Sequence, residues 1–260
     1  MSNKNFKDLL SSIDALNESS AASVYVPSIK QDVPFSPMSV KQQKQILASG
    51  IDNEVENLSF MNALNDIICQ NCRDSKVKIL TCDKPLIVLQ LRKQAVGDTL
   101  KITENDQEYT INLNDHIEAC KNLKGVTKKT FDLTHDTITI SGRIPTLTTD
   151  TQYNKHFTQS VKKNTKTKVK ITDIIGDIYV SELVKYIDTI TIGEVSVSAG
   201  DDLTPANAVQ LFESLPLQVS TKLAEEVKNL REYENECLTS SVLPEDINIS
   251  IDAGLFTASE

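Results

Sequence analysis

The chain has 260 residues, of which 39% are apolar and 24% are charged, and its formal net charge at pH 7 is −9. This balance is typical of a soluble globular protein that is long enough for one large core or two small ones. The acidic net charge argues against non-specific binding to DNA or to an anionic membrane, and the apolar runs, such as Leu86–Leu89, are far too short to span a bilayer.

The first segment, residues 1–23, is rich in Ser and Asn and is expected to be a flexible tail without a signal-peptide core. Apolar residues nevertheless recur in it at helical spacing, namely Phe6, Leu9, Leu10, Ile13 and Leu16. Because a helix of about three turns is marginal in water, it should form only against a surface. The segment is therefore either a frayed terminus or a docking peptide.

An extended, proline-punctuated segment at residues 24–37 leads into the first predicted helix of the body, at Ser39–Ala48. Ser39 is its expected N-cap, and Gln42 stands where a capping box requires a reciprocal acceptor. A second helix is expected at about Val55–Ile68, because apolar residues recur there with helical period.

A third helix is predicted to begin at Pro85, whose missing N–H suits the first helical turn. Spacing of four residues predicts that one stripe of it is buried, formed by Ile87, Leu91 and Ala95. The helix carries no catalytic side chain and is expected to be packed against other elements. Arg92 and Lys93 lie near its end, where cations complement the helix dipole, and are the predicted partner-facing charge pair.

Alternation of apolar and polar residues then predicts a β-hairpin over Thr99–Leu113, turning at Asn105 and Asp106. A further strand is expected at Thr137–Ile144. The composition becomes polar and Lys-rich at residues 148–170, where we expect a linker or a long surface excursion.

The second half of the chain is predicted to be mainly helical, around Ser181–Ile187, from Thr204 as N-cap to Pro216, and from Leu223 to Glu236. The fold class is α+β, with N-terminal helices, a β-hairpin and an additional strand, followed by a mainly α-helical C-terminal half. The predicted units are a flexible tail (1–23), an N-terminal α/β unit (24–147), the Lys-rich excursion or linker (148–170), a mainly helical C-terminal unit (171–243) and an acidic tail (244–260).

Five cysteines in a chain without an export signal indicate reduced thiols in a cytosol. Four cysteines are candidate zinc ligands, with His116 as a substitute, namely Cys69, Cys72, Cys82 and Cys120. The chain has no second CxxC, however, and the spacing does not match a zinc ribbon. A free cysteine at the end of an apolar helix is also typical of a small buried side chain. No metal is therefore assigned.

A basic cluster follows the polar segment and consists of Lys162, Lys163, Lys166, Lys168 and Lys170. It is either a solvated face or a surface for an acidic protein partner. Tyr153 and Phe157 are too few to form a stacking platform for nucleic acid. Together, the cysteines and the Lys162–Lys170 run define an alternative function, that of a metal-stabilised protein associated with nucleic acid.

Catalytic motifs are missing from the sequence. It contains no phosphate-binding loop, no GxGxxG, and neither GxSxG nor HExxH. The three histidines, His116, His135 and His156, stand in no motif that would make one of them a base. We therefore expect a protein that is not an enzyme, with no cofactor and no small-molecule substrate.

Several weak motifs occur in an order and spacing that resemble one known group of proteins. They are Val24–Ser28, Val33–Lys44, Leu89–Asp98, Ile138–Leu147, Phe212–Pro216 and Asp246–Phe256. In this order they resemble the T4-like bacteriophage baseplate hub family, the small tail proteins described as hub subunits or hub assembly proteins. The resemblance covers the chain from about Val24 to its end.

The resemblance implies a non-enzymatic phage tail protein that acts in baseplate hub assembly through protein–protein contacts, as a hub subunit or as an assembly chaperone. It implies other hub or tail proteins as partners, with no nucleic acid and no membrane. It also implies the host cytoplasm as the place of assembly, and the tail baseplate if the protein stays in the virion. The candidate partner-binding residues are Arg92, Lys93, Phe6, Leu9, Leu10 and Ile13.

Overall fold

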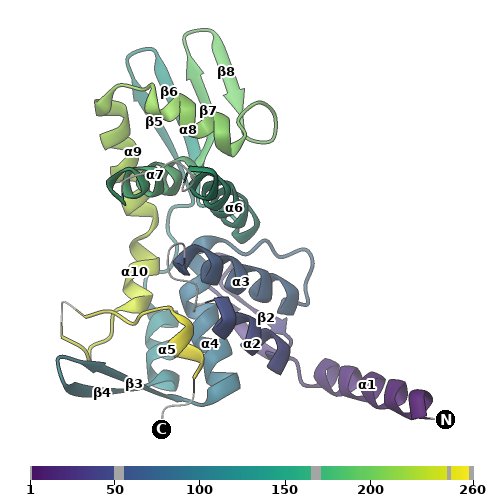
Figure 1. The fold of residues 1–260 in the computed structure, drawn as a ribbon. Helices are drawn as coiled ribbons and strands as arrows, with labels where there is room; N and C mark the ends of the chain where they lie inside the picture. Colours follow the sequence, from purple (N-terminus) through teal and green to yellow (C-terminus); the bar gives the residue numbers. More distant parts are fainter. Residues whose placement is uncertain (1, 50–55, 165–170, 245–246, 258–260) are drawn as a thin grey trace.

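A computed structural model describes residues 2–49, 56–164, 171–244 and 247–257. Helices and small antiparallel sheets alternate along the chain, which confirms the mixed α+β class. The body has a lower and an upper part, each with its own apolar core, and helix α1 (Ser2–Ser19) extends away from the lower part (Figure 1). None of the helices in these ranges is long and apolar enough to cross a membrane.

The lower core is built mainly from helices and two hairpins of the first half of the chain, and residues of the C-terminal segment complete it. Its elements are β1 (Ala22–Val26), β2 (Gln31–Phe35), α2 (Val40–Ser49), α3 (Glu56–Asn71), a short 3-10 turn η1 (Thr81–Asp83), α4 (Lys84–Val96), β3 (Thr99–Glu104), β4 (Gln107–Asn112) and α5 (Leu113–Asn122). The capping box of α2 is confirmed, because the Ser39 N–H donates to Gln42 Oε1 at 2.9 Å and the Gln42 N–H donates to Ser39 Oγ at 3.2 Å.

Helix α4 is surrounded by the lower core, and its residues from Lys84 to Arg92 are all buried. A helix with apolar residues on every side is stable only where other elements bury it on every side. Its one central polar side chain, Gln90, accepts the Tyr25 N–H at 2.9 Å and donates to the Tyr25 carbonyl at 3.1 Å, so it completes the edge of β1. The predicted stripe is buried at Ile87 and Leu91, but Ala95 is exposed because the last turn extends beyond the core.

The hairpin of β3 and β4 is confirmed at the predicted place, with a two-residue turn. Asn105 and Asp106 have φ values of 52° and 62°. This left-handed conformation at both turn residues matches the right-handed twist of the strands, and Asn and Asp tolerate it better than most residues.

The upper core lies under a four-stranded antiparallel sheet in the order β5-β6-β7-β8. Its strands are β5 (Thr130–His135), β6 (Ile138–Arg143), β7 (Ile187–Ile192) and β8 (Val195–Ser198). The strand predicted at Thr137–Ile144 is β6. The helix predicted around Ser181–Ile187 differs, because α7 (Ile171–Val184) ends and β7 begins there.

A Cβ atom at Gly142 would lie 2.4 Å from the Phe131 ring, so this bulge position requires glycine.

The remaining helices are α6 (Leu147–Asn164), α8 (Pro205–Glu213), α9 (Leu217–Leu230) and α10 (Glu232–Leu238). Of these, α8 and α9 belong to the upper core, α10 packs on the lower core, and α6 contributes side chains to both. Residues 148–164 of the segment expected as an excursion or linker belong instead to helix α6, which packs against α3 and buries Tyr153 and Phe157, and the rest of that segment lies outside the described residues. The segment expected as an acidic tail also differs, because Ile249 and Phe256 are buried in the lower core. Both segments are polar in overall composition, which led to the prediction of exposed structure. The few apolar residues spread among the polar ones are nevertheless buried.

Candidate functional site

Helix α1 presents an apolar face that no other described element covers. The face consists of Phe6, Leu9, Ile13 and Leu16, whose exposed fractions lie between 43% and 64%. Spacings of three and four residues alternate along it, which is the pattern of a seam between packed helices. We call these four residues the α1 seam. The Leu10 side chain lies outside the described residues. The sequence indicated that this helix would need a surface, whereas here the helix forms with its seam uncovered.

Arg92 and Lys93, predicted to face a partner together, lie in different environments. Lys93 is exposed in the last turn of α4. Arg92 has an exposed fraction of 1%, and its guanidinium donates to the Gly97 carbonyl where the helix ends. Arg92 therefore does not present its charge on the surface, because its side chain folds back to satisfy the carbonyl that follows the helix.

The four candidate zinc ligands are not brought together. Cys69 and Cys72 stand at the end of α3, Cys82 is buried in the upper core, and Cys120 is buried in the lower core. Within the described ranges, no group of three or more His, Cys, Asp or Glu side chains is arranged to hold a metal ion. Burial also raises the pKa of the Cys82 thiol, which disfavours the thiolate that zinc would require.

We expect that Cys72→Ser will shift the midpoint of thermal unfolding by no more than a few degrees, because the change is small and the side chain is half-buried. Differential scanning calorimetry, with and without a chelator, measures this shift. Stoichiometric zinc in the purified protein together with unfolding by the chelator would contradict the expectation.

A thiol and an imidazole do meet elsewhere, between α5 and α10. His116 Nε2 lies 2.9 Å from the Cys237 carbonyl oxygen and 3.6 Å from Cys120 Sγ. A hydrogen bond with the Cys237 thiol and the contact with His116 lower the pKa of Cys120. The exposed fractions of Cys120 and His116 are 2% and 8%. This pair resembles a nucleophile and its base in composition, but both side chains are buried, and neither lines the cavity between the two parts of the molecule that is described below.

The basic cluster at Lys162–Lys170 lies outside what the structure describes. The backbone of α6 continues as far as Asn164, so Lys162 and Lys163 belong to this helix, but their side chains and residues 165–170 are not described. The proposal that this cluster contacts a partner stays a prediction.

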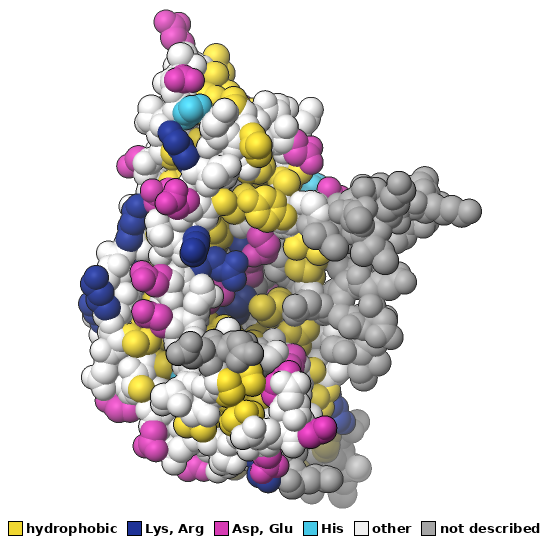
Figure 2. Space-filling model, turned by 90° about the vertical axis from the view of Figure 1, so that its left-hand side faces the viewer, with side chains coloured by type: hydrophobic (Ala, Val, Ile, Leu, Met, Phe, Trp, Pro, Cys, Tyr) yellow, Lys and Arg dark blue, Asp and Glu magenta, His cyan; other side chains and the backbone are white. Residues whose placement is uncertain are grey.

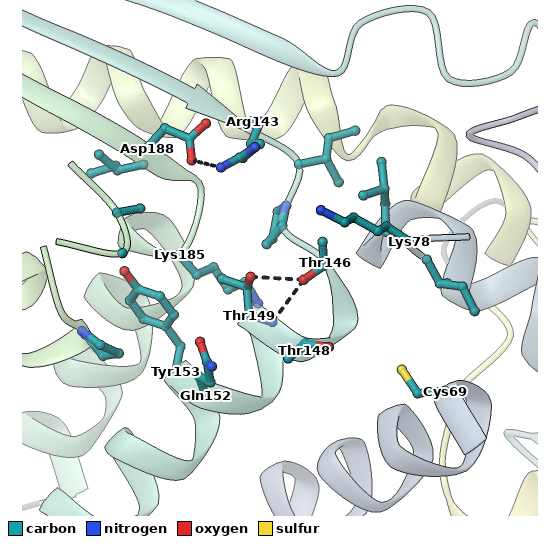
Figure 3. Close-up of a pocket in the computed structure, with 18 of the residues that line it drawn as sticks. Cys69, Lys78, Arg143, Thr146, Thr148, Thr149, Gln152, Tyr153, Lys185 and Asp188 are labelled. Atoms are coloured by element: carbon teal, nitrogen blue, oxygen red, sulfur yellow. Dashed lines mark hydrogen bonds and ion pairs between the residues drawn. The ribbon is translucent and has the colours of Figure 1, made fainter. Parts of the chain in front are cut away.

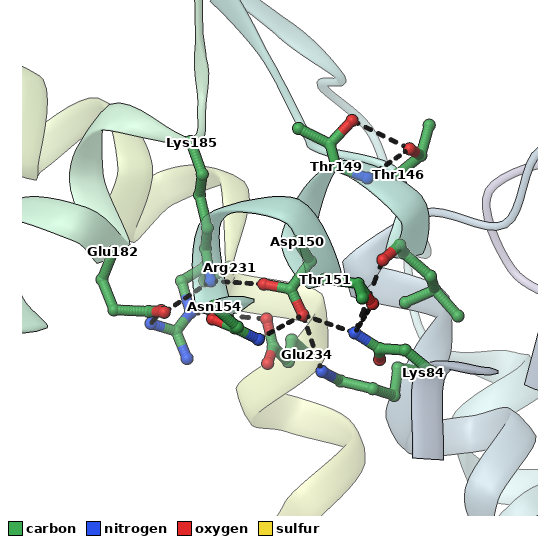
Figure 4. A network of polar contacts seen from close by, with 12 residues as sticks. Lys84, Thr146, Thr149, Asp150, Thr151, Asn154, Glu182, Lys185, Arg231 and Glu234 are labelled. Carbon is green, nitrogen blue, oxygen red and sulfur yellow. Dashed lines mark hydrogen bonds and ion pairs between the residues drawn. The ribbon is translucent and has the colours of Figure 1, made fainter. Parts of the chain in front are cut away.

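A buried ion network joins the lower and upper parts of the molecule (Figure 4). Asp150, near the start of α6, lies with Oδ1 2.7 Å from Lys185 Nζ and with Oδ2 3.5 Å from Lys84 Nζ. Asn65 of α3 donates to Oδ2 at 2.8 Å. All three charged side chains are less than a tenth exposed. The network therefore connects α3 and α4 of the lower part to α6 and the end of α7.

The protonation of Asp150 follows from these neighbours. Burial alone would raise the pKa of Asp150, but the charges of Lys84 and Lys185 and the hydrogen bonds from Lys185 and Asn65 lower it well below its ordinary value. Lys185 also lies 2.7 Å from Glu182, which contacts Arg231 at 3.9 Å. Figure 2 shows Lys and Arg side chains gathered in a hollow at this level of the molecule.

A cavity of about 1160 Å³ opens between the two parts (Figure 3). Its lower wall is the end of α3 and the loop that follows it, including Cys69 and Lys78. Its upper wall includes the first turns of α6, where Thr146 Oγ1 accepts the Thr149 N–H at 3.1 Å and so begins the helix. Arg143 closes one end by its 2.7 Å ion pair with Asp188. Sequence spacing gave no signal for this cavity, because its walls come from distant segments.

Comparison with known proteins gives one match. The family model described as "T4 bacteriophage base plate protein" matches residues 20–246. The matched range includes the upper core, most of the lower core and the cavity, and it leaves out all of α1 and the buried residues Ile249, Leu255 and Phe256. No curated protein and no solved structure matches the chain.

Proposed function

Because the chain belongs to the family of T4 bacteriophage base plate proteins, we propose that it acts in assembly of the baseplate hub through contacts with other tail proteins. It acts either as a subunit of the hub or as an assembly chaperone, and it meets its partners in the host cytoplasm. The proposal includes no catalytic step, since the thiol–imidazole pair at Cys120 and His116 is buried.

The α1 seam is the observation that supports a contact function. A large apolar side chain gains free energy when it leaves water, of the order of 1.5–3 kcal/mol for complete burial. The seam leaves four such side chains largely exposed on a helix that extends from the body. Two heptads are shorter than a self-sufficient coiled coil requires. We therefore infer that the seam docks into a groove of a larger partner surface. Lys93 is a second candidate contact.

Replacing Leu9 and Ile13 by aspartate should leave the body folded and weaken the partner contact. Apolar anchors at an interface often contribute about 2 kcal/mol or more, which corresponds to roughly thirtyfold in affinity. The measurement is rescue of a phage that lacks this protein, by the plasmid-borne variant, scored as infectious particles. The Leu9→Asp/Ile13→Asp variant should rescue poorly. Its circular dichroism and melting temperature should match those of the control variant Ser11→Asp/Ala15→Asp.

Ser11→Asp/Ala15→Asp is the matched control, because it adds the same charge to the opposite side of α1. It should rescue fully. Full rescue by the seam variant would contradict the proposed role of α1. Mass spectrometry of purified virions and of infected-cell lysate separates the two alternatives, since a hub subunit stays in the particle and a chaperone does not.

A further inference from the structure

The cavity between the two parts has the chemistry of a peptide-binding groove. We propose that it binds an extended acidic segment of a partner protein. This inference rests on the proposed function and adds to it the chemical character of one partner. It concerns a surface separate from the α1 seam, which lies on a helix outside the cavity.

Two cationic side chains in the lining provide the charge complementarity. Lys78 and Lys155 line the cavity and are exposed, and neither forms an ion pair with another of the described residues. Figure 3 shows Lys78 extending into the cavity from the lower wall. Lys185, in contrast, is neutralised by Asp150 and Glu182. Two exposed cations that line one cavity in a chain of net charge −9 favour an anionic occupant.

The size and the neutral lining favour a polypeptide as the occupant. The cavity is larger than the range of about 300–1,000 Å³ that is usual for small-molecule sites. Thr148 and Gln152 are exposed in it, and such hydroxyl and amide groups can pair with the backbone of an extended chain. The half-buried apolar residues Val77 and Leu80 also line the cavity and provide places for alternate side chains.

Nucleic acid fits the same lining less well. Two aromatic rings line the cavity, those of Tyr153 and His156. Tyr153 has an exposed fraction of 6% and cannot offer a face for base stacking, and one half-buried imidazole does not form a platform for successive bases. Asp74, Asp188 and Asp201 also line the cavity, and a continuous row of phosphates would come close to all three. A peptide with spaced carboxylates can place its charges at Lys78 and Lys155 and avoid these aspartates.

The test measures fluorescence polarisation of the purified full-length protein with a labelled twelve-residue peptide of four Glu-Gly-Ser repeats. A peptide with Gln in place of Glu and a twelve-nucleotide single-stranded DNA are the comparison probes. Lys78→Glu/Lys155→Glu should weaken binding of the Glu peptide by about tenfold or more. The milder Lys78→Gln/Lys155→Gln should weaken it less, and both variants should keep the wild-type circular dichroism.

Lys41→Glu/Lys44→Glu is the matched control, because it changes the net charge equally at exposed positions of α2 outside the cavity. It should change the affinity less than twofold. Equal losses in both charge-reversal variants, equal binding of the Gln peptide, tighter binding of DNA, or no binding of the Glu peptide would each overturn the inference. The α1 variants test the proposed function independently, since the seam does not touch the cavity.

Discussion

Replacing Asp150 by alanine should lower the free energy of unfolding by about 3–5 kcal/mol, the usual cost of breaking a buried ion pair. The reason is that Lys84 would be left buried without its carboxylate partner, while Lys185 would keep only Glu182. Asn65 would also lose an acceptor at 2.8 Å. Chemical denaturation followed by circular dichroism measures the change.

Two comparisons test whether the unpaired charges cause this loss. Asp202→Ala removes an exposed carboxylate and should change the free energy of unfolding by less than about 0.5 kcal/mol. The triple variant Lys84→Met/Asp150→Leu/Lys185→Met removes all three charges and should recover part of the stability. If the triple variant is no more stable than Asp150→Ala, the loss comes from packing and not from unpaired charge.

The same carboxylate predicts a dependence on pH. The folded-state pKa of Asp150 lies below its ordinary value, so its contribution to stability is complete above the unfolded-state pKa, about 3.9. The contribution is lost as the pH falls below that value, because the unfolded chain then binds the proton more readily. The stability difference between wild type and Asp150→Ala should therefore be largest near neutral pH and should shrink below about pH 4.

Leu91→Ala should cost about 2–5 kcal/mol, as other truncations of buried leucine do. Leu91 has an exposed fraction of 1% and lies on α4, at the centre of the lower core. Leu217→Ala is the control, since Leu217 is 78% exposed, and it should cost less than about 0.5 kcal/mol. A loss at Leu91 no greater than that at Leu217 would show that α4 does not hold the lower core together.

Features that depend on neighbouring residues were predictable from the sequence. The capping box of Ser39 and Gln42 and the turn at Asn105 and Asp106 are contacts within four residues, so their residue types carry the signal. Thr204 likewise begins α8 by accepting the Asn207 N–H at 3.3 Å. The apolar character of α4 also predicted correctly that other elements surround it.

The hairpin of β7 and β8 was missed although a signal was present. Ile190–Ile192 and Val195–Ser198 alternate apolar and polar residues on either side of Gly193 and Glu194, which is a hairpin pattern. The predicted helix at Ser181–Ile187 extended into the first residue of this hairpin, because α7 ends at Val184 and β7 begins at Ile187. Strand β5 contains only two apolar side chains, Phe131 and Leu133, so its alternation is too brief to stand out in the sequence.

The buried ion network and the cavity could not have been predicted. Asp150, Lys84 and Lys185 come from three separate elements, and no spacing in one sequence pairs them. Arg92 is a case in which a local pattern was misleading. A cation near a helix end usually faces solvent, but the Arg92 guanidinium donates to the Gly97 carbonyl. Contacts between distant segments depend on tertiary packing, which periodicity does not encode.

The central claim is that this chain contacts baseplate proteins through the α1 seam. The most direct measurement is affinity purification of the tagged chain from infected cells, with the co-purifying phage proteins identified and quantified by mass spectrometry. Wild type and Ser11→Asp/Ala15→Asp should retain a baseplate protein in equal amounts, and Leu9→Asp/Ile13→Asp should retain at least about tenfold less. Equal recovery of that protein with all three would contradict the claim.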